Sequence, residues 1–140
     1  MTHSSIIDTL ILAMKVLIVD DDQSLATIIS VALEKEGFTT VVSYSGKDGL
    51  EKTKSEMPNL VLLDQVLPDI SGNQVLKEIK IDEKTKAIPV LMLSNFGQTE
   101  MVSQAINDGA NDYIFKYQVE VADIINKVRD ALKPTEQPAA

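Results

Sequence analysis

The chain has 140 residues, of which 44% are hydrophobic and 24% charged, a balance that fits one globular domain with its own core. The formal net charge of −8 and the lack of a basic cluster argue against a nucleic-acid-binding surface. Cysteine is absent, which excludes a disulfide scaffold and a cysteine-ligated zinc site. The only histidine is His3, in the leading segment, which excludes a histidine zinc site and a histidine nucleophile relay.

Residues 1–13 form an apolar leading segment before Met14. Four of its apolar residues fall at helical spacing: Ile6, Ile7, Leu10 and Ile11. The segment is too short to span a membrane and lacks the basic region and cleavage site of a signal peptide, so we expect no membrane insertion. Three interpretations remain, in order of preference: an upstream or non-native start, a helix that packs on the domain or on a partner chain, and a membrane-surface anchor.

The first half of the domain alternates strands and helices. Lys15–Val19 predicts a strand, and a helix follows from Gln23, with Gly37 as its stop. The apolar stripe of this helix is Leu25, Ile28, Ile29, Ala32 and Leu33. Thr39–Ser43 is a short β-branched strand, and Gly46–Met57 predicts a polar helix that Pro58 ends.

Asn59–Leu63 is an aliphatic run typical of a strand buried on both faces, and it ends in Asp64. Pro68 and Gly72 mark a loop before the next helix, whose apolar residues are Val75, Leu76 and Ile79. A charged connection, 82–87, follows it.

The second half repeats the same alternation. Ile88–Leu93 is another buried-type strand and closes with Ser94 and Asn95. Then come a helix that ends at Gly109, a strand over Asn111–Phe115 that ends at Lys116, and a helix over about Val119–Leu132. We therefore expect one domain over 14–133, a flexible tail over 134–140, and an α/β fold with five parallel strands and helices on both faces.

Three adjacent acids, Asp20, Asp21 and Asp22, follow the first strand. Such a run costs stability unless a cation or a helix N-terminus offsets the repulsion. We expect Asp22 to cap the following helix, whereas Asp20 and Asp21 meet Asp64 if their strands are neighbours. Ser94 and Lys116 stand at two further strand ends, and the coincidence of all these groups at one sheet edge favours a ligand site.

Here the chain resembles the receiver domain of bacterial two-component response regulators, in the chemotaxis-response-regulator-like, single-domain form. The resemblance covers Met14 to Lys133. Its marks are the acidic pair Asp20 and Asp21, then Asp64 with Leu67, Pro68 and Gly72 behind it, then Ser94 and Lys116. It implies a flavodoxin-like fold with strand order 2-1-3-4-5.

The resemblance also implies a function. Asp64 would accept a phosphoryl group from a sensor histidine kinase or phosphotransfer protein, with Mg²⁺ held by Asp21, Asp64 and the Val66 carbonyl, and with Asp20 just outside these ligands. Lys116 and the Ser94 hydroxyl would contact the phosphoryl oxygens. Such a protein is cytoplasmic and is no enzyme beyond its own phosphotransfer and dephosphorylation.

Signalling in this family implies a switch in which Ser94 moves and Tyr113, on the fifth strand, follows it. The output face would comprise the helix that follows Ser94, the fifth strand and the last helix. That face would bind a downstream protein target, and it leaves a homodimer open. Since the sequence shows no output domain, we expect the chain to act through a partner or to pass the phosphoryl group on, unless it is part of a longer protein.

Three positions depart from the family pattern. Tyr117 replaces the proline that usually follows the lysine, and because a cis bond before a non-proline residue costs about 3 kcal/mol, we predict a trans Lys116–Tyr117 bond and a differently shaped loop. Asn95 replaces a small residue and narrows access to Asp64. Val66 places an aliphatic side chain near the path of hydrolytic water.

Other functional classes fit less well. A flavin binder needs a glycine-rich phosphate loop where this chain is acidic, and a calcium loop from Asp20 would need glycine where Leu25 stands. A haloacid-dehalogenase-like phosphatase carries a second acid at the place of Val66. The remaining alternative is a pseudo-receiver, a phosphorylation-independent protein-binding module.

Overall fold

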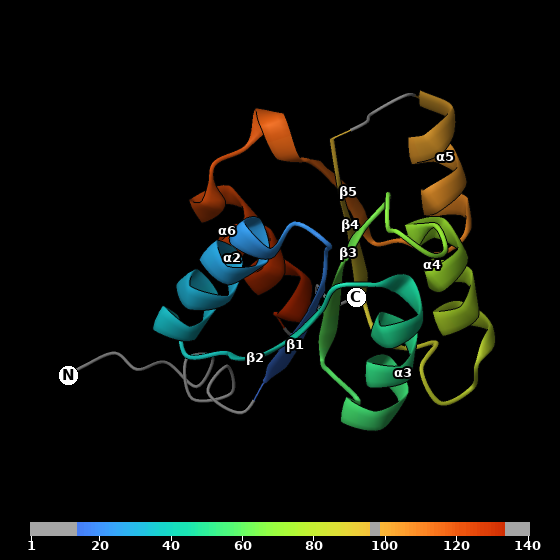
Figure 1. Cartoon of the computed structure of the whole chain (residues 1–140), viewed down its shortest axis with the longest axis horizontal. Coiled ribbons are helices and arrows are strands. Elements are labelled where there is room, and N and C mark those ends of the chain that lie inside the picture. Colours follow the sequence, from blue (N-terminus) through green and yellow to red (C-terminus); the bar gives the residue numbers. More distant parts are fainter. Residues whose placement is uncertain (1–13, 96–98, 134–140) are drawn as a thin grey trace, which may run out of the picture.

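The computed structural model describes residues 14–95 and 99–133 (Figure 1). Within these ranges the chain forms one parallel sheet with the strand order β2-β1-β3-β4-β5, which confirms the predicted architecture. The strands are β1 (Lys15–Val19), β2 (Thr39–Ser43), β3 (Leu60–Asp64), β4 (Val90–Ser94) and β5 (Asp112–Phe115). The leading segment and the tail from residue 134, for which we made predictions above, lie outside the described residues.

Helices cover both faces of this sheet (Figure 1). They are α2 (Gln23–Lys35), α3 (Gly46–Glu56), α4 (Gly72–Ile81), α5 (Thr99–Asn107) and α6 (Val121–Leu132). Helices α2 and α6 pack on one face, and α3, α4 and α5 pack on the other. Among the described residues, every helix falls short of the length and apolar character that a membrane span requires.

The two cores follow from the alternation of side chains along each strand. In β1, Val16 and Ile18 face α2 and α6, whereas Leu17 and Val19 face the opposite layer. All four side chains are fully buried. Continuous aliphatic strands therefore serve a sheet that is covered on both sides, as their sequence predicts.

Most boundaries lie within one residue of the predicted ones, and two differ by two residues. Strand β4 begins at Val90 rather than Ile88, because the Ile88 amide donates to the carbonyl of Thr85 and Pro89 has no N–H to offer the ladder. The last helix begins at Val121 rather than Val119, because the backbone of Val119 is extended and Glu120 is the N-cap, in a capping box with Asp123.

Helix α2 begins and ends as predicted. The Asp22 carboxylate accepts a hydrogen bond from the Leu25 amide at 3.1 Å and so caps the helix N-terminus. After its last turn, Gly37 has a φ of 103°, a conformation that favours glycine. The cap at Asp22 fixes where α2 begins, and so fixes the short connection from β1 that contains Asp20 and Asp21.

Candidate functional site

The carboxyl ends of β1 and β3 bring three acids together. These strands are neighbours, with Val19 paired to Leu63, so the residues that follow them meet at the same sheet edge. Carboxylate oxygens of Asp20, Asp21 and Asp64 all lie within 4.8 Å of one another. The expected meeting of the acids is therefore present in the structure.

The three acids differ in burial. Asp20 is 1% exposed and Asp64 is 6% exposed, whereas Asp21 faces solvent. Asp20 Oδ1 accepts a hydrogen bond from the Asp22 amide at 2.9 Å, and Asp64 Oδ1 accepts a longer one from the Val66 amide at 3.4 Å. Two of the charges thus lie in a shielded environment with few donors, where repulsion is strong.

Lys116 supplies the opposite charge. Its Nζ lies 2.8 Å from Asp20 Oδ2 and 3.3 Å from Asp64 Oδ2, and its side chain is only 10% exposed. No described peptide bond is cis, so the predicted trans Lys116–Tyr117 bond is confirmed. The 3₁₀ turn that begins at Lys116 lets the ammonium reach the acids without the usual proline.

The electrostatics of the cluster shift two pKa values. Burial, followed by the charge of Asp20, raises the pKa of Asp64 to about 6, although Lys116 and the Val66 amide act in the opposite direction. Burial acts to lower the pKa of Lys116, but its contacts with Asp20 and Asp64 outweigh this effect and raise it. The site therefore holds more negative charge than its single cation offsets.

The donor set fits a hard divalent cation. Asp20 Oδ2 is buried and, apart from the ion-pair contact with Lys116, accepts no aligned hydrogen bond from the described residues. Asp20, Asp21 and Asp64 each offer a carboxylate oxygen within 4.8 Å of the other two, close enough for one ion to contact all three. Mg²⁺ prefers such oxygen ligands and retains several waters, so these residues could hold it.

A cavity of about 160 Å³ opens over the cluster. It is lined by Asp21, Asp22, Asp64, Val66, Asn95 and Lys116. Asn95 and Val66, two of the positions that depart from the family pattern, therefore flank Asp64 at the opening. The cavity gives Asp64 an approach from solvent even though the residue itself is largely buried.

Ser94 and Tyr113 lie deeper. Ser94 is the last residue of β4, is fully buried, and does not line this cavity. Tyr113 in β5 is also buried, and its ring packs against Phe115 with centroids 5.5 Å apart and planes tilted by 47°. The structure thus brings Asp20, Asp21, Asp64 and Lys116 together and keeps these two residues in the adjoining core.

Two features of the loop from β3 to α4 fix the position of Asp64. A Cβ added at Gly72 would lie 2.0 Å from the carbonyl oxygen of Asp64, so only glycine fits where α4 begins. Asp69 accepts hydrogen bonds from the amides of Gly46 and Lys47 at 2.7 and 2.8 Å, which ties the loop to the N-terminus of α3. The Lys47 bond is the largest cause of lowering the pKa of Asp69 to about 2.

The role of Asp69 was not predicted from the sequence. Asp69 lies 23 positions from Gly46, and no local pattern connects them. The one available signal was that an acid so close behind a strand end can serve a helix N-terminus elsewhere.

Comparison with known proteins agrees with this geometry. The family model for the response regulator receiver domain matches residues 16–129. The DNA-binding dual master transcriptional regulator RpaA of Synechocystis is 33% identical over 123 residues, which are 88% of this chain and 51% of RpaA. Response regulator ArlR of Staphylococcus saprophyticus is 34% identical over 119 residues, which are 85% of this chain and 52% of ArlR. The chain thus spans about half the length of these relatives.

Solved structures match more fully. A CheY-like receiver domain protein from Methanospirillum hungatei has a TM-score of 0.80 and 29% identity, covering 85% of this chain and 93% of that one. The BeF₃-activated receiver domain of RstA from Klebsiella pneumoniae has a TM-score of 0.77 and 28% identity, covering 86% and 99%. The likeness therefore extends over more than nine tenths of each solved chain.

Proposed function

Because the chain belongs to the response regulator receiver domain family, we propose that it accepts a phosphoryl group on Asp64 from a sensor histidine kinase or phosphotransfer protein. The observation that supports this most is the position of Asp64, buried beside Asp20 and 3.3 Å from the ammonium of Lys116. A carboxylate so placed faces the small cavity that gives a phosphodonor access.

The chemistry follows from the residue types. A carboxylate oxygen of Asp64 would form the new P–O bond while the P–N bond of a phosphohistidine breaks, which leaves an acyl phosphate on the receiver. Lys116 would turn from the carboxylates toward a phosphoryl oxygen, a short movement given its present distance from Asp64. Mg²⁺, when bound by Asp21, Asp64 and the Val66 carbonyl beside Asp20, would offset the negative charge of the acids and the phosphoryl oxygens.

Signalling would pass from the site into the α5–β5–α6 face. We assign Ser94 and Tyr113 to this route because Ser94 is the buried last residue of β4 and Tyr113 belongs to the core cluster that contains Ala105 of α5. A new phosphoryl group adds negative charge and acceptor oxygens beside Ser94, and a shift of its hydroxyl would alter the space around the Tyr113 ring. A downstream protein, or a second copy of the chain, would read the changed face.

The test is a mass measurement after incubation with a small phosphodonor such as acetyl phosphate. A phosphoryl-sized gain is expected that requires Mg²⁺, is absent from Asp64→Asn, and persists in Asp22→Asn. Asp22 is a stringent control because it lines the same cavity, yet its carboxylate caps α2. No gain in wild-type protein that binds partners unmodified would support the pseudo-receiver instead.

A further inference from the structure

A cavity of about 330 Å³ lies between α2 and α6, apart from the acidic cluster. None of its lining residues lines the cavity over Asp64. The lining comes from the end of α2 and the first half of α6, and it includes Ala32, Lys35, Glu36, Val121, Ala122 and Ile125. Its purpose therefore has to be sought outside phosphoryl transfer.

The apolar surface beside this cavity continues along α2. Ile28 is 52% exposed and Val31 is 45% exposed. Ile28 lies one helical turn before Ala32 and so on the same side of α2 as the cavity. Among the described helices, only α2 exposes two large hydrophobic side chains. Adjoining exposed apolar groups of this kind typically mark a surface that another segment covers.

The chain enters the domain beside the same end of α2. The carbonyl of Met14 accepts a hydrogen bond from the amide of Thr39 at 2.9 Å, and Thr39 follows α2 after a short connection. The partly buried Met14 packs against the core cluster that Ala32 also contacts. The leading segment, residues 1–13, is therefore attached next to the part of α2 that lines the cavity.

The leading segment has a matching apolar pattern and a suitable length. Its large apolar residues at helical spacing are Ile6, Ile7, Leu10 and Ile11. Eight residues of α-helix rise about 12 Å, which is also the rise of α2 from Ile28 to Glu36. Two residues remain between Ile11 and Met14 for the chain to turn. A helix over residues 4–11 can thus extend along the exposed side of α2.

The charges are complementary as well. Asp8 is the only acid of the leading segment, which contains no lysine or arginine. Lys35 lines the cavity, is exposed, and pairs with no acid among the described residues. Glu36 is already paired with Arg129. An acid that borders the apolar stripe, as Asp8 does directly after Ile7, would therefore find its partner in Lys35.

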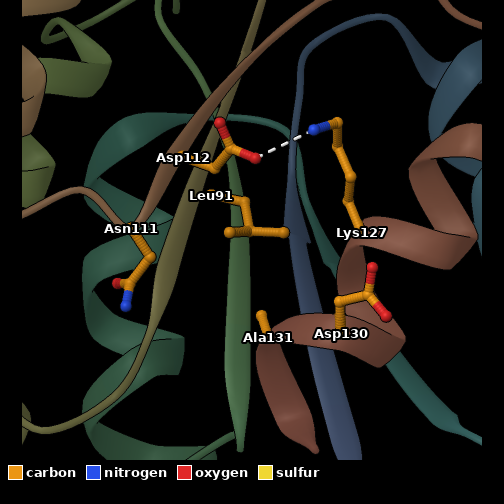
Figure 2. Close-up of a pocket in the computed structure, with 6 residues that line it drawn as sticks. All are labelled: Leu91, Asn111, Asp112, Lys127, Asp130 and Ala131. Atoms are coloured by element: carbon orange, nitrogen blue, oxygen red, sulfur yellow. Dashed lines mark hydrogen bonds and ion pairs between the residues drawn. The ribbon is translucent and has the colours of Figure 1, made fainter.

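The cavity between β5 and α6 has a similar volume, about 330 Å³, but a different lining. Figure 2 shows Lys127 directed at Asp112, with Nζ to Oδ2 at 3.0 Å, and the acid Asp130 nearby. Asp130 pairs in turn with Lys133. An apolar segment would have to desolvate these charges, so this second cavity does not suit it.

We propose that residues 1–13 fold back as a short amphipathic helix and dock on the surface formed by α2 and α6. The apolar stripe of the segment covers Ile28, Ala32 and Val121, and Asp8 pairs with Lys35. The occupant is a segment of the same chain because its attachment at Met14 gives it a high effective concentration at this surface. A separate partner would have to compete with that tethered segment.

The experiment is paramagnetic broadening of NMR signals in the full chain. Because the sequence has no cysteine, Thr9→Cys carries a single nitroxide label, on the side of the helix opposite Ile7. The amide signals of Ile28 and Ala122 should lose intensity, whereas those of Ile81 on α4 should not. Broadening of no amide in the domain, or equal broadening on all its faces, would overturn the proposal.

Two variants of the labelled protein locate the contact, and a third is the control. Leu10→Asp in the segment and Ile28→Ser on α2 should each abolish the selective broadening. Ile81→Ser should leave it unchanged, because this residue is 74% exposed on a different helix. An unperturbed amide spectrum elsewhere in each variant verifies the fold. Broadening that survives Leu10→Asp, or that Ile81→Ser also abolishes, would show the proposal to be wrong.

A mixing experiment separates docking within one chain from docking on a second copy. Spin-labelled protein without ¹⁵N is mixed with unlabelled-cysteine-free ¹⁵N protein, so that only contacts between chains broaden the observed signals. We expect no selective broadening of α2 in the mixture. Its appearance there would assign the segment to a second copy and overturn the proposal. Because the protein is unphosphorylated throughout, either result leaves the assignment of Asp64 untouched.

Discussion

Replacing Asp64 by Asn should stabilise the metal-free protein at neutral pH. Asp64 is 6% exposed and adjoins the buried carboxylate of Asp20, so its charge is held in the folded state against desolvation and repulsion. Asn has nearly the same shape and carries no charge. The substitution therefore removes the unfavourable charge and leaves the packing nearly unchanged.

The expected gain follows from the pKa of Asp64. Folding raises it from 3.8 to about 6. At about 1.4 kcal/mol per pH unit, this shift corresponds to at most about 3 kcal/mol of stability lost to ionisation. This pKa already includes the favourable contact with Lys116. We therefore expect Asp64→Asn to raise the free energy of unfolding by about 1–3 kcal/mol.

The gain should depend on pH with a defined sign. Because the folded pKa is the higher one, the folded state binds the Asp64 proton more tightly than the unfolded state does. Wild-type stability from this group is therefore present below the unfolded value of 3.8 and is lost as pH rises to about 6. The advantage of Asp64→Asn should grow across that window and stay constant above it.

Urea unfolding in EDTA at several pH values measures this difference. Mg²⁺ should then stabilise the wild type, by about 1.4 kcal/mol at ten times its dissociation constant, and stabilise Asp64→Asn less. Asp22→Asn is the control, and no comparable gain is expected because its carboxylate caps α2. An Asp64→Asn protein no more stable than wild type at pH 7.5 in EDTA would refute the charge-repulsion argument.

Three further substitutions test the supports of the site. Gly72→Ala should lower the free energy of unfolding by about 2–4 kcal/mol, because its Cβ would lie 2.0 Å from the Asp64 carbonyl; an unchanged urea midpoint would contradict this. Asp69→Asn should lower the free energy of unfolding at pH 7, and this loss should shrink as pH falls from about 4 toward the folded pKa of about 2. A loss measured by urea unfolding that is independent of pH would argue against the bonds from the Gly46 and Lys47 amides. Lys116→Met should raise the pKa of Asp64 further, as read by carboxyl ¹³C NMR titration, and slow phosphorylation about 100-fold; an unchanged pKa would show that the ion pair matters little.

The strands and helices could be predicted because their signals are local, whereas the strand order that brings Asp20 and Asp21 to Asp64 was implied by the family resemblance. Apolar runs such as Leu60–Asp64 show strands covered on both faces, and an acid at the end of each neighbouring strand must reach the same edge. The cap at Asp22 and the trans bond after Lys116 are also properties of adjacent residues. Such features follow from local backbone preferences and from the sheet order.

Contacts between distant loops could not be predicted in the same way. The bonds from Gly46 and Lys47 to Asp69, and from Asn73 to Asp108, join residues 22 to 35 positions apart. Their formation depends on how α3, α4 and α5 pack, which no periodicity in the sequence specifies.

The most direct test of the central claim identifies the acceptor residue chemically. After phosphorylation with acetyl phosphate and Mg²⁺, borohydride reduces an acyl phosphate to an alcohol and so converts the modified aspartate to homoserine, which peptide mass spectrometry can locate. We predict homoserine at Asp64 alone, although Asp20 and Asp21 lie within 4.8 Å of it. Homoserine at either neighbour, or at none of the three while the intact protein gains a phosphoryl group, would contradict the assignment.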